Sequence, residues 1–537
     1  MAQPAPDWIS FEADKTEGLD LLGLRAPVQQ IGNQRFDGVT TVTPKLRYLS
    51  VLTWIIWRYS QARLPDAWRP FERFIEAQEA MIALANRLKS RDIGNLVGVT
   101  KASKLLDSGR QNFPLRRLVQ QIAFNVYVTT SRQLHLTHDE MDSGLSGLTK
   151  ERGLRLAQAF DATIRDTAYG RQLERRPTID KTSRDALEEL ADGVFLDRIP
   201  RGEREILIDA IMPPKPETEE ERNRLAQYAL LLWLTRANGQ EPEESDVFDA
   251  ARNIPRGLPK ALVPVLNDWL EYIIRDVIAV THEAVFGAVM REVDIATAER
   301  GGPAAAERVV AGLLDESEEH SAVLRQLNLL RRNESAHEIS FATLRDRVHR
   351  ACREEESVSS GLRRWRNGLS ETELYRMAMA SGRAAAIFLP VAWCLAAERV
   401  SPELRNAPAA SRRILSIGRI FQIGLEQIIL PKIDEFAREA RTLREVMAEL
   451  ITRTVQQHLR VAWTRFAPPQ GKDVSVLIAD NDTWARNNGF KPGRTDSRLW
   501  VAISWLNQLR LIGDDGLTAT GTRILDRSLA ILSRGHA

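Results

Sequence analysis

The sequence predicts a mainly α-helical protein, built from several helical subdomains and a small carboxy-terminal module. Apolar residues recur at helical spacing along most of the 537-residue chain, whereas the alternation typical of strands is scarce. The chain is too long for one ordinary core, and its 43% hydrophobic and 27% charged residues are the balance of a folded protein. We find no repeat of fixed period, so a regular solenoid is not predicted.

The first half is expected to be a series of helices that form an amino-terminal domain, residues 1–212. In residues 44–59, Thr43 can cap and Pro44 suits the first helical position, while apolar residues on all sides predict burial. Further helices are expected at 65–90, at 115–134 and within 144–164, the last with Thr149 as its cap. The prolines and glutamates of "IMPPKPETEEE", residues 211–221, predict a connector.

A central helical domain is expected over residues 221–466. Its first helix should stop at Asn238-Gly239, and a long helix should follow over 258–293. Beyond a loop at Gly301-Gly302, helices are expected at 304–331, 341–354, 370–398, 411–436 and 440–466. Pro390 should kink the third of these. "FAPPQGKD", residues 466–473, reads as the next boundary.

The last segment, residues 474–537, has a distinct pattern. In "DSRLWVAISWLNQLRLI", Leu499, Ala502, Ile503, Leu506 and Leu509 form one apolar helical face, which Asp496 or Ser497 can cap. The opposite face carries Arg498 and Gln508. Next, Asp514-Asp515-Gly516 can turn a short hairpin, and Thr518 can cap a final helix.

This order of helix, hairpin, Leu-Thr-x-x-Gly and helix resembles the second half of a winged-helix domain. In that family the helix before the wing commonly enters the major groove of DNA, and the wing touches the backbone. The resemblance implies that Lys491, Arg494 and Arg498 meet phosphates or base edges, and that Arg510 lies at the base of the wing. Winged helices also serve as protein-docking modules, so the fold alone leaves both roles open.

Charge and cysteine content narrow the possible functions. The formal charge of +2 gives no global attraction to nucleic acid, so binding must come from a local patch among the 62 arginines and 12 lysines. The carboxy-terminal segment from Lys472 has nine basic and seven acidic residues, and is therefore only slightly positive. Two cysteines can form neither a disulfide framework nor an unaided tetrahedral zinc site.

The sequence contains few motifs that are typical of enzymes. We find no phosphate-binding glycine loop, H-E-x-x-H, C-x-x-C or G-x-S-x-G, so no cofactor is expected and any ATPase would be a partner. Arg332, Asn333 and His337 match the R-N-x-x-x-H spacing of HEPN ribonucleases, in which the histidine would move the 2′-hydroxyl proton. "HLTHDEMD", with His135, His138, Asp139, Glu140 and Asp142, could hold a divalent ion, but a solvated loop is favoured and no metal is expected.

Three functions follow as hypotheses. The first is a non-enzymatic DNA-binding or adaptor subunit of a bacterial multiprotein DNA-transaction system, with antiphage defence as one setting. Its partners would be DNA and other protein subunits, such as an ATPase or nuclease. The alternatives are a HEPN-like ribonuclease effector using Arg332 and His337, and a scaffold that binds only proteins. A cytoplasmic location is expected, since no signal peptide is recognised and the apolar stretch Leu46–Tyr59 is too short to cross a bilayer.

Overall fold

The computed structural model confirms a mainly helical fold. It describes residues 20–119, 122–139, 145–176, 178–352, 355–357, 363–365, 371–400, 423–466 and 475–534. Among these, no helix is long and apolar enough to cross a membrane.

The chain divides into two compact units, each assembled from separated segments. Unit 1 comprises residues 1–31, 245–258 and 266–496, and unit 2 comprises residues 32–244, 259–265 and 497–537. This division differs from the three consecutive segments expected from the sequence. The segment 474–537 is shared between the units, because its first part pairs with a strand of unit 1 and its last part packs on a helix of unit 2.

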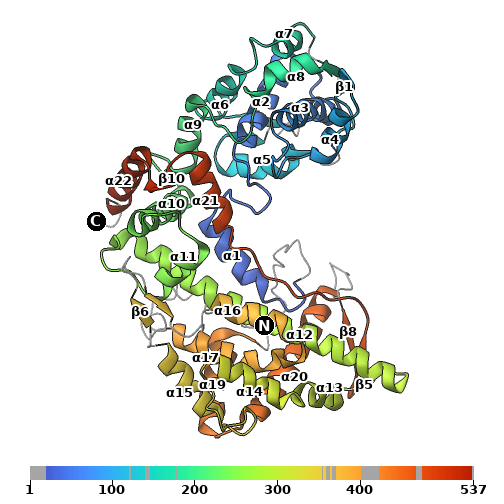
Figure 1. Ribbon diagram of the computed structural model, residues 1–537, viewed down its shortest axis with the longest axis vertical. Helices are drawn as coiled ribbons and strands as arrows, with labels where there is room; N and C mark the ends of the chain where they lie inside the picture. Colours follow the sequence, from blue (N-terminus) through green and yellow to red (C-terminus); the bar gives the residue numbers. More distant parts are fainter. Residues whose placement is uncertain are drawn as a thin grey trace, which may run out of the picture. The chain divides into compact units, whose positions relative to one another are not determined.

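Unit 1 is helical around one long central helix, α12 (Figure 1). Its helices are α11 (Glu244–Arg252), α12 (Val263–Arg300), α13 (Ala306–Leu314), α14 (Ser317–Gln326), α15 (Phe341–Ala351), α16 (Glu371–Ala380), the 3₁₀ helix η2 (Gly382–Ile387), α17 (Phe388–Arg399), the π-helical turn η3 (Leu425–Ile429), α19 (Leu430–Arg438) and α20 (Leu443–Phe466). Helix α1 (Arg25–Arg35) spans the junction of the first two segments.

The described strands of unit 1 form two small antiparallel sheets. The first has the order β5 (Ala304–Ala305), β9 (Thr483–Arg486), β8 (Leu477–Asp480), and the second pairs β6 (Glu355–Ser357) with β7 (Arg363–Trp365). Pairing of Ala304 with Trp484 holds residues 477–486 within unit 1.

Helix α12 is buried on nearly all sides and carries charged residues inside the core. Its buried polar side chains include Asp276, His282 and Glu283. Arg25 forms a two-pronged ion pair with Glu283, whose Oε2 also accepts from the backbone N–H of Gly493 at 3.1 Å. These contacts satisfy carboxylates that would be costly to bury alone.

One expectation about the unit 1 helices is wrong: the stretch 304–331 forms two helices, separated at Asp315-Glu316, instead of one. The stretch 370–398 is not one regular helix either, because α16 ends before Gly382, which has a φ of 58°. Pro390 lies in the first turn of α17, directly after the 3₁₀ helix η2. Residues 411–422 of another expected helix fall outside the described ranges.

Unit 2 contains the remaining helices and three two-stranded sheets. The helices are α2 (Tyr48–Gln61), α3 (Trp68–Lys89), α4 (Val99–Asp107), α5 (Ala123–Gln133), α6 (Gly153–Asp161), α7 (Ala168–Arg175), α8 (Arg184–Ala191), α9 (Arg201–Ile211), α10 (Glu219–Asn238), η1 (Lys260–Leu262), α21 (Leu499–Gln508) and α22 (Ala519–Ser533). The strand pairs are β1 (Asn112–Pro114) with β4 (Lys181–Ser183), β2 (Thr137–Asp139) with β3 (Ser146–Leu148), and β10 (Ile512–Gly513) with β11 (Gly516–Leu517).

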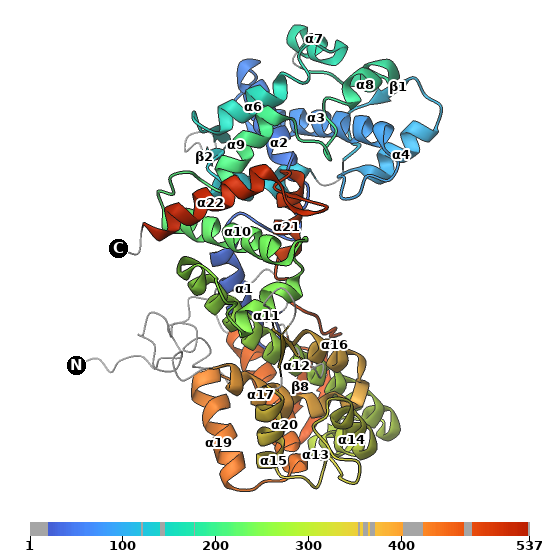
Figure 2. The same cartoon turned by 60° about the vertical axis from the view of Figure 1, so that its left-hand side comes forward.

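Helices α10 and α22 lie side by side in both views (Figures 1 and 2). Thr218 caps α10 by accepting from the N–H of Glu221 at 3.2 Å, and Gly239 ends it with a φ of 69°, so the stop at Asn238-Gly239 is confirmed. The connector expected at 211–221 does separate α9 from α10, but both helices belong to unit 2.

The buried imidazole of His282 should make stability depend on pH. Trp393 Nε1 donates to its Nε2 at 2.9 Å, and Nδ1 contacts Thr454 Oγ1 at 2.7 Å. Burial lowers the pKa of His282 from 6.5 to about 3. The stabilisation by neutral His282 is therefore complete above pH 6.5 and is lost as the pH falls toward 3.

We expect the unfolding free energy of the wild type, minus that of His282→Gln, to fall by roughly 1 kcal/mol per pH unit below 6.5. Urea titrations of both proteins from pH 7.5 to 4 measure this difference. A difference that does not change with pH would contradict the assignment.

Candidate nucleic-acid interface

The four basic residues expected to contact DNA belong to different units. Lys491 and Arg494 lie in unit 1, whereas Arg498 and Arg510 lie in unit 2. Lys491 and Arg510 are exposed, while Arg494 and Arg498 are half-buried.

Arg494 has an intramolecular role. Its Nε donates to Asp276 Oδ2 of α12 at 3.0 Å, and its guanidinium lies 4.7 Å from the ring centre of Tyr375. The Asp276 side chain is only 1% exposed, so it depends on protein partners for its charge. The structure thus places Arg494 in the core packing of α12 and not on a free basic surface.

Arg498 and helix α21 are also engaged within unit 2. Arg498 is the N-cap residue of α21, with a φ of 63°, and its Nη1 donates to the carbonyl of Val39 at 3.0 Å. Trp505 Nε1 donates to the carbonyl of Thr43 at 2.9 Å, and Gln508 Oε1 accepts from the N–H of Leu46 at 2.9 Å. The face of α21 that was expected to read DNA is therefore covered by residues 39–46.

The elements after α21 follow the expected order. Ile512 pairs with Leu517, and Asp514 and Asp515 form the exposed tip of the hairpin β10–β11. Thr518 caps α22 by accepting from the N–H of Gly521 at 3.0 Å, as predicted. Arg510, with a φ of 55°, lies at the base of this hairpin.

Arg510 belongs to a cluster of guanidinium groups that the sequence did not reveal. We call this cluster the α9 arginine patch: Arg204, Arg510 and Arg523. Burial, and next the nearby charge of Arg510, lower the pKa of Arg204. Glu205 lies close enough to Arg204 and Arg523 to feel both charges, but its carboxylate is bound by Arg201 at 2.9 Å. Among the described residues, none of the three patch arginines forms an ion pair.

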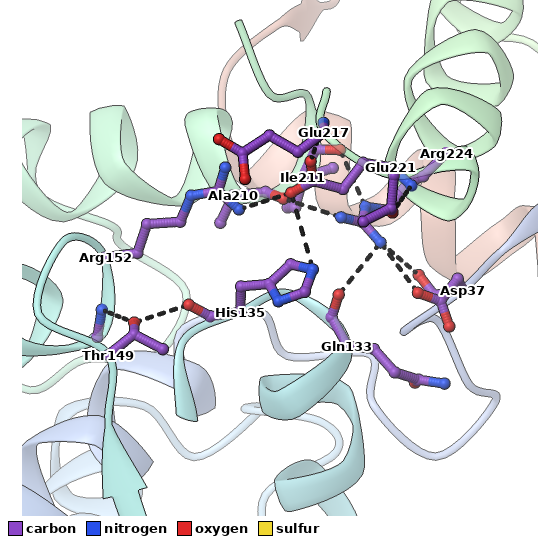
Figure 3. A network of polar contacts seen from close by, with 12 residues as sticks. Asp37, Gln133, His135, Thr149, Arg152, Ala210, Ile211, Glu217, Glu221 and Arg224 are labelled. Carbon is purple, nitrogen blue, oxygen red and sulfur yellow. Dashed lines mark hydrogen bonds and ion pairs between the residues drawn. The ribbon is translucent and has the colours of Figure 1, made fainter. Parts of the chain in front are cut away.

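The guanidinium of Arg224, also in unit 2, forms hydrogen bonds only with groups of the protein itself in Figure 3. Arg224 is buried and donates to the carbonyls of Ile211 at 3.2 Å and Gln133 at 3.3 Å, and to Asp37 Oδ2 at 3.2 Å. This network ties α10 to three other segments.

The candidate metal ligands are not brought together. His135 Nε2 lies 3.9 Å from Glu221, which Arg152 also contacts at 3.0 Å (Figure 3). Asp139 is paired with Arg132 at 2.6 Å. Glu140 and Asp142 are outside the described residues, and within those that are described no group of three or more His, Cys, Asp or Glu could hold a metal.

The ribonuclease constellation is not assembled either. Arg332 and Asn333 are exposed in a turn, not in a helix. His337 Nε2 lies 3.0 Å from His320 Nδ1, and Arg444 Nη1 lies 3.3 Å from His337 Nδ1. Because a guanidinium only donates, His337 Nδ1 accepts and its Nε2–H donates to His320. Both nitrogens of His337 are thus engaged, and burial followed by Arg444 lowers its pKa. The structure gives this hypothesis no support.

Comparison of the chain with known protein families, characterised proteins and solved structures gives no match. The winged-helix resemblance therefore stays a prediction. Arg204 and Arg523 were missed because they join Arg510 only through the tertiary fold. The "RGERE" stretch that contains Arg204 carries no signal of its own.

Arg494→Ala should destabilise unit 1 by about 2 kcal/mol or more, because a buried carboxylate loses a charged hydrogen bond. Lys491→Ala, three residues away and exposed, is the matched control and should leave stability unchanged. Chemical denaturation measures both. Equal stability of the two variants would show that the contact with Asp276 is not stabilising.

His337→Ala should lower stability by about 1 kcal/mol through loss of its bond to His320. His337→Ala should not change any cleavage of a labelled single-stranded RNA by the protein. If the variant abolishes an RNA cleavage that the wild type performs, and unfolds at the same temperature, His337 is catalytic.

Proposed function

We propose that this protein is a non-enzymatic adaptor whose unit 2 binds the phosphate backbone of DNA. The observation that carries the proposal is the α9 arginine patch. Like charges held near one another repel. Glu205 offsets part of this charge, but its carboxylate is also bound by Arg201, and an anionic ligand would relieve the remaining repulsion. Guanidinium groups also match the geometry of phosphate oxygens.

The position of the patch supports a backbone contact more than base reading. Arg510 lies at the base of the hairpin β10–β11, and α21 is covered by residues 39–46. Phosphate contacts position a protein on DNA but carry no sequence information. We therefore expect binding with little sequence preference.

The double variant Arg204→Ala/Arg510→Ala tests this. Loss of two phosphate contacts should weaken binding at low salt and reduce the slope of log affinity against log salt by about 2. Fluorescence anisotropy with a labelled duplex of about 30 base pairs, between roughly 50 and 200 mM NaCl, measures both quantities.

Arg91→Ala is the matched control, since Arg91 is an arginine of unit 2 with an 84% exposed side chain outside the patch. It should leave the salt slope unchanged. Arg204→Lys/Arg510→Lys keeps the charge and should retain most of the binding. Wild-type affinity in the double alanine variant would overturn the proposal.

A further inference from the structure

In unit 2, the carboxylate of Glu79 on α3 caps the amino-terminal end of α5. Its Oε2 accepts from the backbone N–H of Ala123 at 2.6 Å, and its Oε1 accepts from that of Phe124 at 2.7 Å. Ile122, the N-cap residue of α5, has no side-chain acceptor for these first N–H groups. A residue of a different helix therefore supplies the cap.

The capping carboxylate is buried without a cation. Glu79 is only 4% exposed, and it forms no ion pair with any described residue. Side chains of α2 and α5 surround it, among them Tyr48, Leu52 and Tyr127, and the space that they leave is too small for a water molecule. An ionised carboxylate in these surroundings lacks both water and a counter-ion, so its charged form is costly. Water can reach the carboxylate only if a neighbouring element moves away.

The other titratable groups near Glu79 do not offset its charge. Burial raises the pKa of Tyr48 and that of Tyr127, so both phenols stay neutral, and their oxygens accept from backbone N–H groups at 3.1 Å. Glu76, on the same helix, is a like charge. Burial raises the pKa of Glu79 from 4.5 to about 7, although the two N–H bonds lower it. Both protonation states are therefore populated near neutral pH.

We propose that Glu79 is a proton-sensitive cap, which holds the amino-terminal end of α5 while it is protonated and releases that end when it is ionised. The protonated carboxyl still accepts through its carbonyl oxygen. On release, the proton passes to solvent and the carboxylate becomes hydrated. The carboxy-terminal end of α5 stays attached, because Arg224 donates to the carbonyl of Gln133 at 3.3 Å. This conformational switch does not depend on DNA binding.

The direction of the switch follows from the two states of Glu79. In the released state the carboxylate lies in water, where its ordinary pKa of 4.5 applies. The raised pKa of the closed state means that the closed state binds the proton more tightly. The stabilisation of the closed state is therefore complete below pH 4.5 and is lost as the pH rises toward 7.

Hydrogen exchange of the full-length chain tests this, with mass spectrometry and correction for the intrinsic effect of pH. Protection of the first turn of α5 should fall at least about tenfold from about pH 5 to about pH 8, because each unit of pKa difference changes the opening equilibrium tenfold. Glu79→Gln cannot ionise and should show no such fall. Glu76→Gln, one turn earlier on α3, is the matched control and should retain it.

The amides of α10 distinguish local release from unfolding of the whole unit. They should exchange more slowly than the first turn of α5 at every pH, and equal rates would overturn the local release. Protection of α5 that does not change with pH, or an unchanged pH profile in Glu79→Gln, would also overturn the inference. If Glu79→Gln does not fold, the profiles of the wild type and of Glu76→Gln still decide the matter.

Discussion

Unit 1 depends on the satisfaction of charges buried on α12. This helix is enclosed on nearly all sides and carries Asp276 and Glu283. The two buried carboxylates need cationic or N–H partners from other segments. Arg25 supplies one partner from the amino-terminal segment, and residues 493 and 494 supply others from far along the chain. The hydrophobic contacts of α12 are non-directional, whereas these bonds fix which segments lie against it and in which register.

In unit 2 two of the buried charged groups are arginines, and carboxylates and backbone carbonyls satisfy them. Arg47 is fully buried, pairs with Glu203 at 2.6 Å, and also donates to the carbonyls of Gly193 and Phe195. Arg224 is satisfied by Asp37 and backbone carbonyls. Arg47 and Arg224 therefore hold segments of unit 2 together and are not free to bind a ligand. The α9 arginine patch brings guanidinium groups of unit 2 near one another, which suits a polyanionic ligand.

The sequence alone determined much of the local structure. Helical spacing predicted α10, α12 and α20, and the turn and cap signals placed β10–β11 and Thr518 correctly, because these features depend on residues a few positions apart. Only the tertiary structure decided which of the candidate site residues are engaged within the protein and which lie near one another. Residues 39–46 cover α21, Arg494 pairs with Asp276, and Arg204 lies near Arg510. Each of these arrangements joins segments that are more than two hundred residues apart in the sequence. Local periodicity carries no information about such contacts, since they form only when separate helices pack together.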